Sequence, residues 1–423
     1  MDAMDKVFHA ELRKHFSFSK VGAQLIAKKI QDKGYPVSEA QFAELEAVLE
    51  KMQLEEDKVS MELDTIFPEI KEDISIEFEE SELESVYNDV ESKTYSLSTR
   101  ITRRIARSLL KSLEKDAPRM LKEHADIQQS FERNLQHKWG AALDYLKMLT
   151  VICYESGEEF NKEFQEKETF KNDYVFHVLV RLHARACQIA NEVLALLQAG
   201  YADGAHARWR TLHEISVVAS FVKDQGNDVA ERYLLHQQIE SYKAALQQKK
   251  YATRLNQTAI SETEIDSLRN LQDNLVVKYG KEYKNSYGWA AHALGKSNPN
   301  FSDIEEAVSL DHLRPYYKLA SHNIHANPKG ILFRLGNKKE NILLAGASNL
   351  GLADPGHGTA ISLTQVTICL LFTEVNIDRM VVGQTLLRLT DKIGQKFIKV
   401  HRNTENKIRR NRRGRIYFHS KKI

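Results

Sequence analysis

Two short segments concentrate side chains that could take part in acid–base or phosphate chemistry. In the first, Arg210, His213 and Glu214 fall on one face of a helix predicted over Tyr201–Asp224. The neighbouring residues are strongly apolar, so this polar stripe is expected to be partly buried, where charges need partners. Arg210 and Glu214 are four residues apart, so the stripe fits a structural ion pair as well as a site.

The second segment lies at the end of a helix predicted over Asp311–Ala326. Polar side chains gather there at helical spacing: Tyr317, Ser321, His322 and His325. Serine and histidine are mediocre helix formers, so their clustering needs a reason. One reason is capping and turn chemistry ahead of Asn327-Pro328. The other is a site, because histidine exchanges protons near neutral pH.

Together the two segments predict a composite site for metal-independent cleavage of RNA. That reaction uses the 2′-hydroxyl, which DNA lacks, as its nucleophile. A histidine moves the proton, and an arginine stabilises charge on the phosphate. The candidate catalytic residues are Arg210, His213, Glu214, Ser321, His322 and His325. We therefore expect the Arg210 and His325 stripes to face one another across packed helices.

No cofactor or metal is expected. His322 and His325 could chelate from one helical turn, but a zinc site requires further ligands, and the sequence has no H-E-x-x-H motif or paired cysteines. The three cysteines are widely spaced and odd in number, which argues against a disulfide framework and is typical of a protein in a reducing cytoplasm. The apolar stretch Ala360–Val382 contains several polar residues, so we expect a buried core helix and no membrane contact.

Basic residues point to nucleic acid, with RNA favoured over DNA by the composite site. At the C-terminus the candidate contacts are Arg409, Arg410, Arg412, Arg413, Arg415 and Tyr417. Earlier in the chain, Arg100, Arg104, Arg107, Lys111 and Lys115 follow one helical face. Either set could instead be solvated, or neutralised by the acidic segment 55–91, which is itself a candidate protein-binding segment. A homo-oligomer is a further candidate assembly.

The elements that must position these residues are helical. The chain of 423 residues is 42% apolar, with only 19 glycines and 7 prolines, which favours an all-α multi-helix bundle. We predict five regions: a helical hairpin (1–54), an acidic linker or interaction segment (55–97), a basic amphipathic helix (98–125), a helical core domain (126–402) and a basic tail (403–423).

Within the core, the predicted helices are Trp139–Leu149, Tyr174–Gln198, Tyr201–Asp224, Asp228–Arg254, Glu262–Val277, Asp311–Ala326, Thr359–Met380 and Gly383 to about Arg410. One short β-hairpin is predicted, pairing Ile331–Leu335 with Asn341–Ala345 across Gly336-Asn337. Asp354–Thr359 is predicted to be a turn, with Thr359 as the N-cap of the next helix.

The arginine and glutamate four apart, followed by Y-x-x-x-S-x-x-x-H, resemble an all-helical bacterial family catalogued as domain of unknown function 5677. The resemblance would cover about Asp173 to Leu389 and implies an all-α fold without an established activity. Arg208 and His213 also resemble the Arg-x(4)-His spacing of the HEPN superfamily, although Trp209 stands where a polar residue is usual.

Members of the first family look like accessory or defence genes of bacteria. The leading functional hypothesis is therefore a bacterial toxin or antiviral defence effector acting on RNA. The alternative is a non-enzymatic helical binding or scaffold protein, whose Arg–Glu and His stripes are structural.

Overall fold

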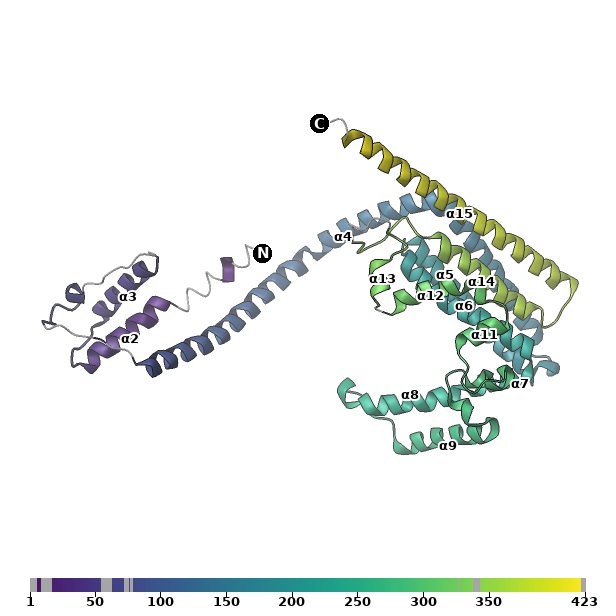
Figure 1. The fold of residues 1–423 in the computed structure, drawn as a ribbon, viewed down its shortest axis with the longest axis horizontal. Helices are drawn as coiled ribbons and strands as arrows, with labels where there is room; N and C mark the ends of the chain where they lie inside the picture. The colour runs from purple at the N-terminus through teal and green to yellow at the C-terminus, as the bar shows by residue number, and fades with distance from the viewer. Residues whose placement is uncertain are drawn as a thin grey trace. The chain divides into compact units, whose positions relative to one another are not determined.

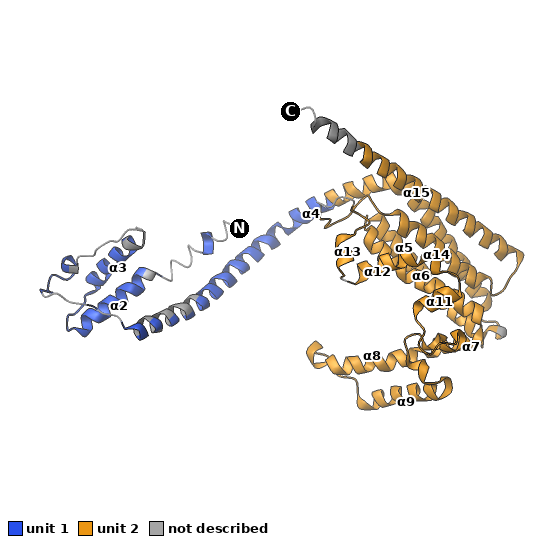
Figure 2. Ribbon diagram, viewed as in Figure 1, with its two compact units in different colours: residues 1–126 blue, residues 127–423 orange. Residues whose placement is uncertain are grey.

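The computed structural model describes residues 6–8, 17–54, 63–71, 76, 79–325, 327–337 and 343–419. These residues form helices joined by turns and short connections, without a β-strand, which confirms the predicted all-α class (Figure 1). The chain divides into two compact units, residues 1–126 and 127–423 (Figure 2).

The first unit contains the predicted helical hairpin, formed by α2 (Phe18–Asp32) and α3 (Glu39–Leu54). Ser38 and Gln41 form a capping box at the start of α3. The Ser38 amide donates to Gln41 Oε1 (2.9 Å), and the Gln41 amide donates to Ser38 Oγ (3.3 Å). A small apolar core joins the hairpin to the 3-10 turn η1 (Leu63–Thr65) and the residues after it: Ala23, Ile30, Leu45, Ile66 and Phe67.

The helix α4 (Glu80–Phe164) is one continuous element of 85 residues. The sequence predicted a basic helix over 98–125 and a separate short helix over Trp139–Leu149. Both segments are helical, but they belong to the single helix α4, so the predicted break between them is wrong. The residues between them are mostly good helix formers, and the helix continues through Pro118. The last part of the predicted acidic linker, from Glu80, also belongs to α4. Residues 55–62, 72–75 and 77–78 of that linker lie outside the described residues.

The core of the second unit is built from α5 (Tyr174–Gln198), α6 (Ala202–Gln225), α14 (Ala353–Leu371) and α15 (Ile377–His419), with the C-terminal half of α4. Helix α14 packs against α5, α6 and α15 and is largely buried. Within the described residues, no helix is long and apolar enough to cross a membrane.

Shorter elements surround this core. They are η2 (Glu168–Phe170), α7 (Asn227–Leu235), α8 (Gln237–Tyr251), η3 (Thr253–Leu255), α9 (Glu262–Tyr279), η4 (Lys281–Lys284), η5 (Gly288–Ala290), α10 (Ala291–Leu294), α11 (Phe301–Ala307), η6 (Asp311–Leu313), α12 (Arg314–Ile324) and α13 (Pro328–Leu332). The helix predicted over Asp228–Arg254 is interrupted at His236, between α7 and α8.

The β-hairpin prediction is wrong where the structure describes it, because Ile331 and Leu332 belong to α13. Asn327 caps this helix by accepting from the Gly330 amide (3.1 Å), and Pro328 occupies its first position, which favours a helix start. Residues 341 and 342 of the second predicted strand lie outside the described residues, and residues 343–345 do not form a strand.

The last two helices also differ from expectation. Helix α14 begins at Ala353, so Thr359 lies inside it and is not its N-cap. The break that follows comes at residues 372–376, about eight residues earlier than predicted. Helix α15 then extends to His419, past the expected end near Arg410.

Candidate functional site

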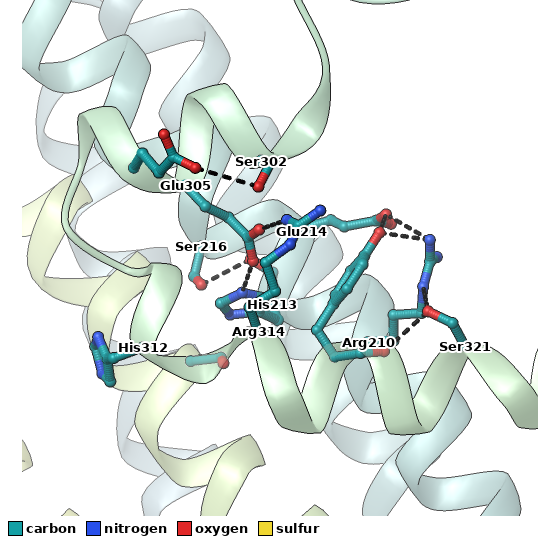
Figure 3. A network of polar contacts seen from close by, with 12 residues as sticks. Arg210, His213, Glu214, Ser216, Ser302, Glu305, His312, Arg314 and Ser321 are labelled. Atoms are coloured by element: carbon teal, nitrogen blue, oxygen red, sulfur yellow. Dashed lines mark hydrogen bonds and ion pairs between the residues drawn. The ribbon is translucent and has the colours of Figure 1, made fainter.

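A polar network joins α6 to α12 at the positions predicted from the two stripes (Figure 3). Arg210 Nε donates to Ser321 Oγ (2.9 Å), and Arg210 Nη2 donates to the Tyr317 hydroxyl. The Tyr317 hydroxyl donates in turn to Glu214 Oε1 (2.7 Å), which lies 3.2 Å from Arg210 Nη2. The structure therefore brings together Arg210, Glu214 and Ser321, with Tyr317 at the centre.

The members of this network satisfy one another. The Arg210 guanidinium also lies over the Tyr317 ring, 4.4 Å from its centroid. Burial, together with the hydrogen bond to the Glu214 carboxylate, raises the pKa of Tyr317, so its hydroxyl stays protonated and donates. The Arg210 and Glu214 side chains keep 21% and 27% of their surface exposed. The network thus fixes α12 on α6 while one edge remains open to water.

His325 does not join this network in the described structure. Helix α12 ends at Ile324, and His325 is its C-cap with an extended backbone and an exposed side chain. The i, i+4, i+8 stripe therefore stops at Ser321, because its third position falls one residue beyond the helix. His322 Nδ1 lies 2.6 Å from Asn327 Nδ2, a contact within the turn that follows. Among the described residues, no hydrogen bond or ion pair joins His325 to Arg210, whose side chain instead contacts Ser321, Tyr317 and Glu214.

His213 belongs to a second network, which is buried except for Arg314, whose side chain keeps 28% of its surface exposed. Its Nε2 lies 2.8 Å from Glu305 Oε1 on α11, and both side chains are completely inaccessible to solvent. Arg314, the first residue of α12, binds the other oxygen of Glu305. Burial lowers the pKa of His213 to about 4, and the nearby positive charges of Arg314 and Arg210 act in the same direction. His213 is therefore neutral and donates to a carboxylate already paired with arginine.

A stack of aromatic rings occupies the inner face of α6. The His206 and Trp209 rings are 5.3 Å apart and nearly parallel, and His213 lies 5.5 Å from Trp209. His206 is completely buried, and neither of its ring nitrogens has a hydrogen-bond partner among the described residues. Desolvation lowers its pKa to about 4. Segment 204–214 therefore supplies core packing on one face and the α12 contact on the other.

The Arg208–His213 pair does not form a site. Arg208 pairs with Glu192 on α5, whereas His213 pairs with Glu305 on α11. At five residues along a straight helix the two side chains point about 140° apart. The described residues also contain no group of three or more His, Cys, Asp or Glu side chains arranged to hold a metal ion.

The predicted basic stripe follows α4 along one face. Arg100, Arg103, Arg104, Arg107 and Lys111 line an open hollow of about 700 Å³ together with Ser96, Thr99 and Ser108. Arg103 also lies on this face, beside Arg104 and Arg107, although it is not part of the stripe predicted from the sequence. Arg409 and Arg410 are exposed on α15. Arg412, Arg413, Arg415 and Tyr417 lie in the same helix, but their side chains are outside the described part.

Comparison with known proteins gives one match. The model of a family of unknown function, DUF5677, matches residues 176–342, which extend from α5 beyond α13 and include both polar networks. The match is shorter than the expected Asp173 to Leu389. Searches of the curated proteins and of the solved structures found no match. The resemblance to the family of unknown function DUF5677 is thus confirmed over residues 176–342 of this chain.

Proposed function

We propose that this protein is a helical nucleic-acid-binding protein, with RNA as its favoured ligand, and that the basic face of α4 is its contact surface. The basic face is defined here as Arg100, Arg103, Arg104, Arg107 and Lys111. The observation that supports this proposal is their convergence on one open hollow. The role of a toxin or defence effector stays a prediction.

The charge around this face favours a polyanion. The sequence from Ser92 to Leu113 contains no Asp or Glu, so every formally charged side chain in this stretch is positive. Farther along α4 the pattern changes, and Arg119 lies 3.8 Å from Asp116 and 3.7 Å from Glu123. Arginine side chains bind phosphate oxygens with paired N–H donors, and the release of counterions makes such binding depend on salt.

The two polar networks favour a structural role over catalysis. His213 is inaccessible to a substrate and is neutral at physiological pH. The Arg210 guanidinium is already bound to two hydroxyls and to Glu214. These residues therefore fix α6, α11 and α12 in place, which supports the non-enzymatic alternative for residues 176–342.

Titration with labelled RNA at three salt concentrations tests the binding surface. The double variant Arg103→Gln/Arg107→Gln should bind more weakly, and its slope of log K against log salt should flatten by about 0.7–0.9 for each lost phosphate contact. The matched control is Arg119→Gln, which removes one charge from the same helix at a position with acidic neighbours. Equal affinities and slopes for the wild type and the double variant would refute the proposal. Duplex DNA in parallel shows which nucleic acid is preferred.

A metal-independent ribonuclease is the second candidate function, and one observation favours it. The Ser321 hydroxyl is held by the Arg210 guanidinium at the partly open edge of the network, and the half-buried His322 follows it directly. An enzyme of this kind should shorten RNA in the presence of a metal chelator, and His322→Ala or His325→Ala should abolish the cleavage. His137→Ala, an exposed histidine on α4, is the control. If the wild-type protein leaves the RNA intact in the presence of the chelator, the ribonuclease candidate is excluded.

A further inference from the structure

Helix α4 has a second exposed face, which is apolar. Its residues from Arg103 to Asp126 are almost all exposed. Large apolar side chains on this stretch keep 41–62% of their surface open to solvent: Leu109, Leu110, Leu113, Met120 and Leu121. Single exposed apolar residues are ordinary, but a run of them along one helix indicates an interaction surface. We propose that this face pairs with the same face of a second copy, as a parallel two-stranded coiled coil.

The spacing of the apolar residues is that of a coiled-coil seam. Ala106, Leu110, Leu113, Ala117, Met120 and His124 follow one another at alternating intervals of four and three residues. This is the interval at which a and d positions of a heptad meet a partner helix. Leu110 and Ala117 then occupy a positions, and Leu113 and Met120 occupy d positions. Leu109 and Leu121 flank the seam and widen it.

Most of the basic face lies away from this seam, and Arg103, at the a position seven residues before Leu110, marks the N-terminal end of the seam. At 100° per residue, the basic face is centred about 120° away from the apolar seam. Pairing therefore leaves Arg104 and Lys111 accessible. Pro118 lies on the same side as the basic face, so its missing N–H and its ring do not enter the seam. This proposal does not depend on nucleic-acid binding.

The charged residues that flank the seam favour pairing with a second copy in parallel orientation. In an in-register parallel pair, Leu109 lies opposite Glu114 of the other copy, and Asp116 lies opposite Leu121, so no like charges meet beside the seam. An antiparallel pair with full overlap would place Glu114 opposite Glu114 and Asp116 opposite Asp116. Like charges in such positions are destabilising. With full overlap of the seam, the parallel arrangement is therefore the one that avoids like charges beside it.

The oligomeric state of the full-length protein tests this inference. Light scattering after size exclusion, over a range of loading concentrations, should give twice the chain mass of 48.5 kDa. Leu110→Glu/Leu113→Glu should halve that mass, because it introduces like charges into two layers of the seam. The matched control is Ser108→Glu/Ser112→Glu, which adds the same charge to the same helix at exposed positions outside the seam. Far-UV circular dichroism should be unchanged for both variants.

A cysteine variant tests the orientation. Leu113→Cys should form an intermolecular disulfide under mild oxidation, because identical d positions face each other in a parallel pair. The native cysteines Cys153, Cys187 and Cys369 are buried. The unmodified protein, oxidised in the same way, is therefore the control for disulfides that do not involve position 113. A monomer at every concentration, or a Leu110→Glu/Leu113→Glu variant that stays dimeric, would overturn the pairing. A dimer that gives no Leu113→Cys disulfide would overturn the parallel orientation.

Discussion

The free energy of unfolding should fall steeply as the pH drops from about 6.5 to about 4. Three fully or almost fully buried histidines dominate this expectation: His183, His206 and His213. Burial is the largest cause of the lowered pKa of each, and each value falls from 6.5 to about 4. The expected result is a strong acid sensitivity that exposed histidines would not produce.

The sign of the effect follows from proton binding. Between pH 6.5 and pH 4 the unfolded chain binds a proton on each of these imidazoles, whereas the folded protein does not. Stability is therefore fully present above pH 6.5 and is lost as the pH falls toward 4. Each histidine contributes a slope of up to about 1.4 kcal/mol per pH unit. Chemical unfolding followed at several pH values measures the slope directly.

The variant His206→Phe tests directly how much His206 contributes to the pH dependence of stability. Both ring nitrogens of His206 lack partners among the described residues, and the ring stacks on Trp209, so an aromatic hydrocarbon can take its place. We expect little change in stability at pH 7.5 and a gain at pH 5, with the slope reduced by roughly one proton. His137→Phe, at an exposed position, is the control. An unchanged slope in His206→Phe would show that His206 is not responsible.

The sequence predicted helices well where their ends have local causes. Helix α5 begins at the predicted residue because Asp173 accepts from the Phe176 amide (3.1 Å). The chain turns after α5 and after α6 at Gly200 and Gly226, whose φ angles of 80° and 79° favour glycine. Signals of this kind are visible in a sequence because they involve residues only a few positions apart.

Glycines in α14 misled the prediction because their role is in packing. Gly356 and Gly358 suggested a turn, yet both lie inside the helix. A Cβ at Gly356 would lie 2.4 Å from the Phe397 ring, and one at Gly358 would lie 2.8 Å from Trp209 Nε1. The glycines allow α15 and α6 to approach α14 closely, and no local pattern reveals such contacts.

The same limit applies to the candidate site. Spacing predicted that Arg210 and Glu214 share a face, and helix periodicity suggested Tyr317 and Ser321 as their partners. It did not indicate Glu305 and Arg314, which surround His213, because α11 joins the site from outside both segments. Helix periodicity also predicted that His325 belongs to the stripe of Tyr317 and Ser321. This prediction is wrong because α12 ends at Ile324, just before the turn at Asn327-Pro328, and periodicity alone does not reveal where a helix ends.

The buried network gives the second large effect, expected from Arg314→Met. Glu305 is completely inaccessible, and Arg314 is the cation bound to it. Removing that cation leaves a carboxylate inside the core with only neutral His213 beside it. Breaking a buried ion pair from one side costs about 3–5 kcal/mol of unfolding free energy. Denaturant unfolding at pH 7.5 should show this loss.

A comparison with Glu214→Ala separates the two networks. Glu214 and Arg210 are partly exposed, so water replaces the lost partner, and the cost should be about 1 kcal/mol. The double variant Glu305→Gln/Arg314→Met removes the charge together with its cation and should recover part of the stability lost in Arg314→Met. Equal losses for Arg314→Met and Glu214→Ala would mean that Glu305 is solvated. His213 would then be accessible to solvent as well, and the case against a catalytic role for it would fail.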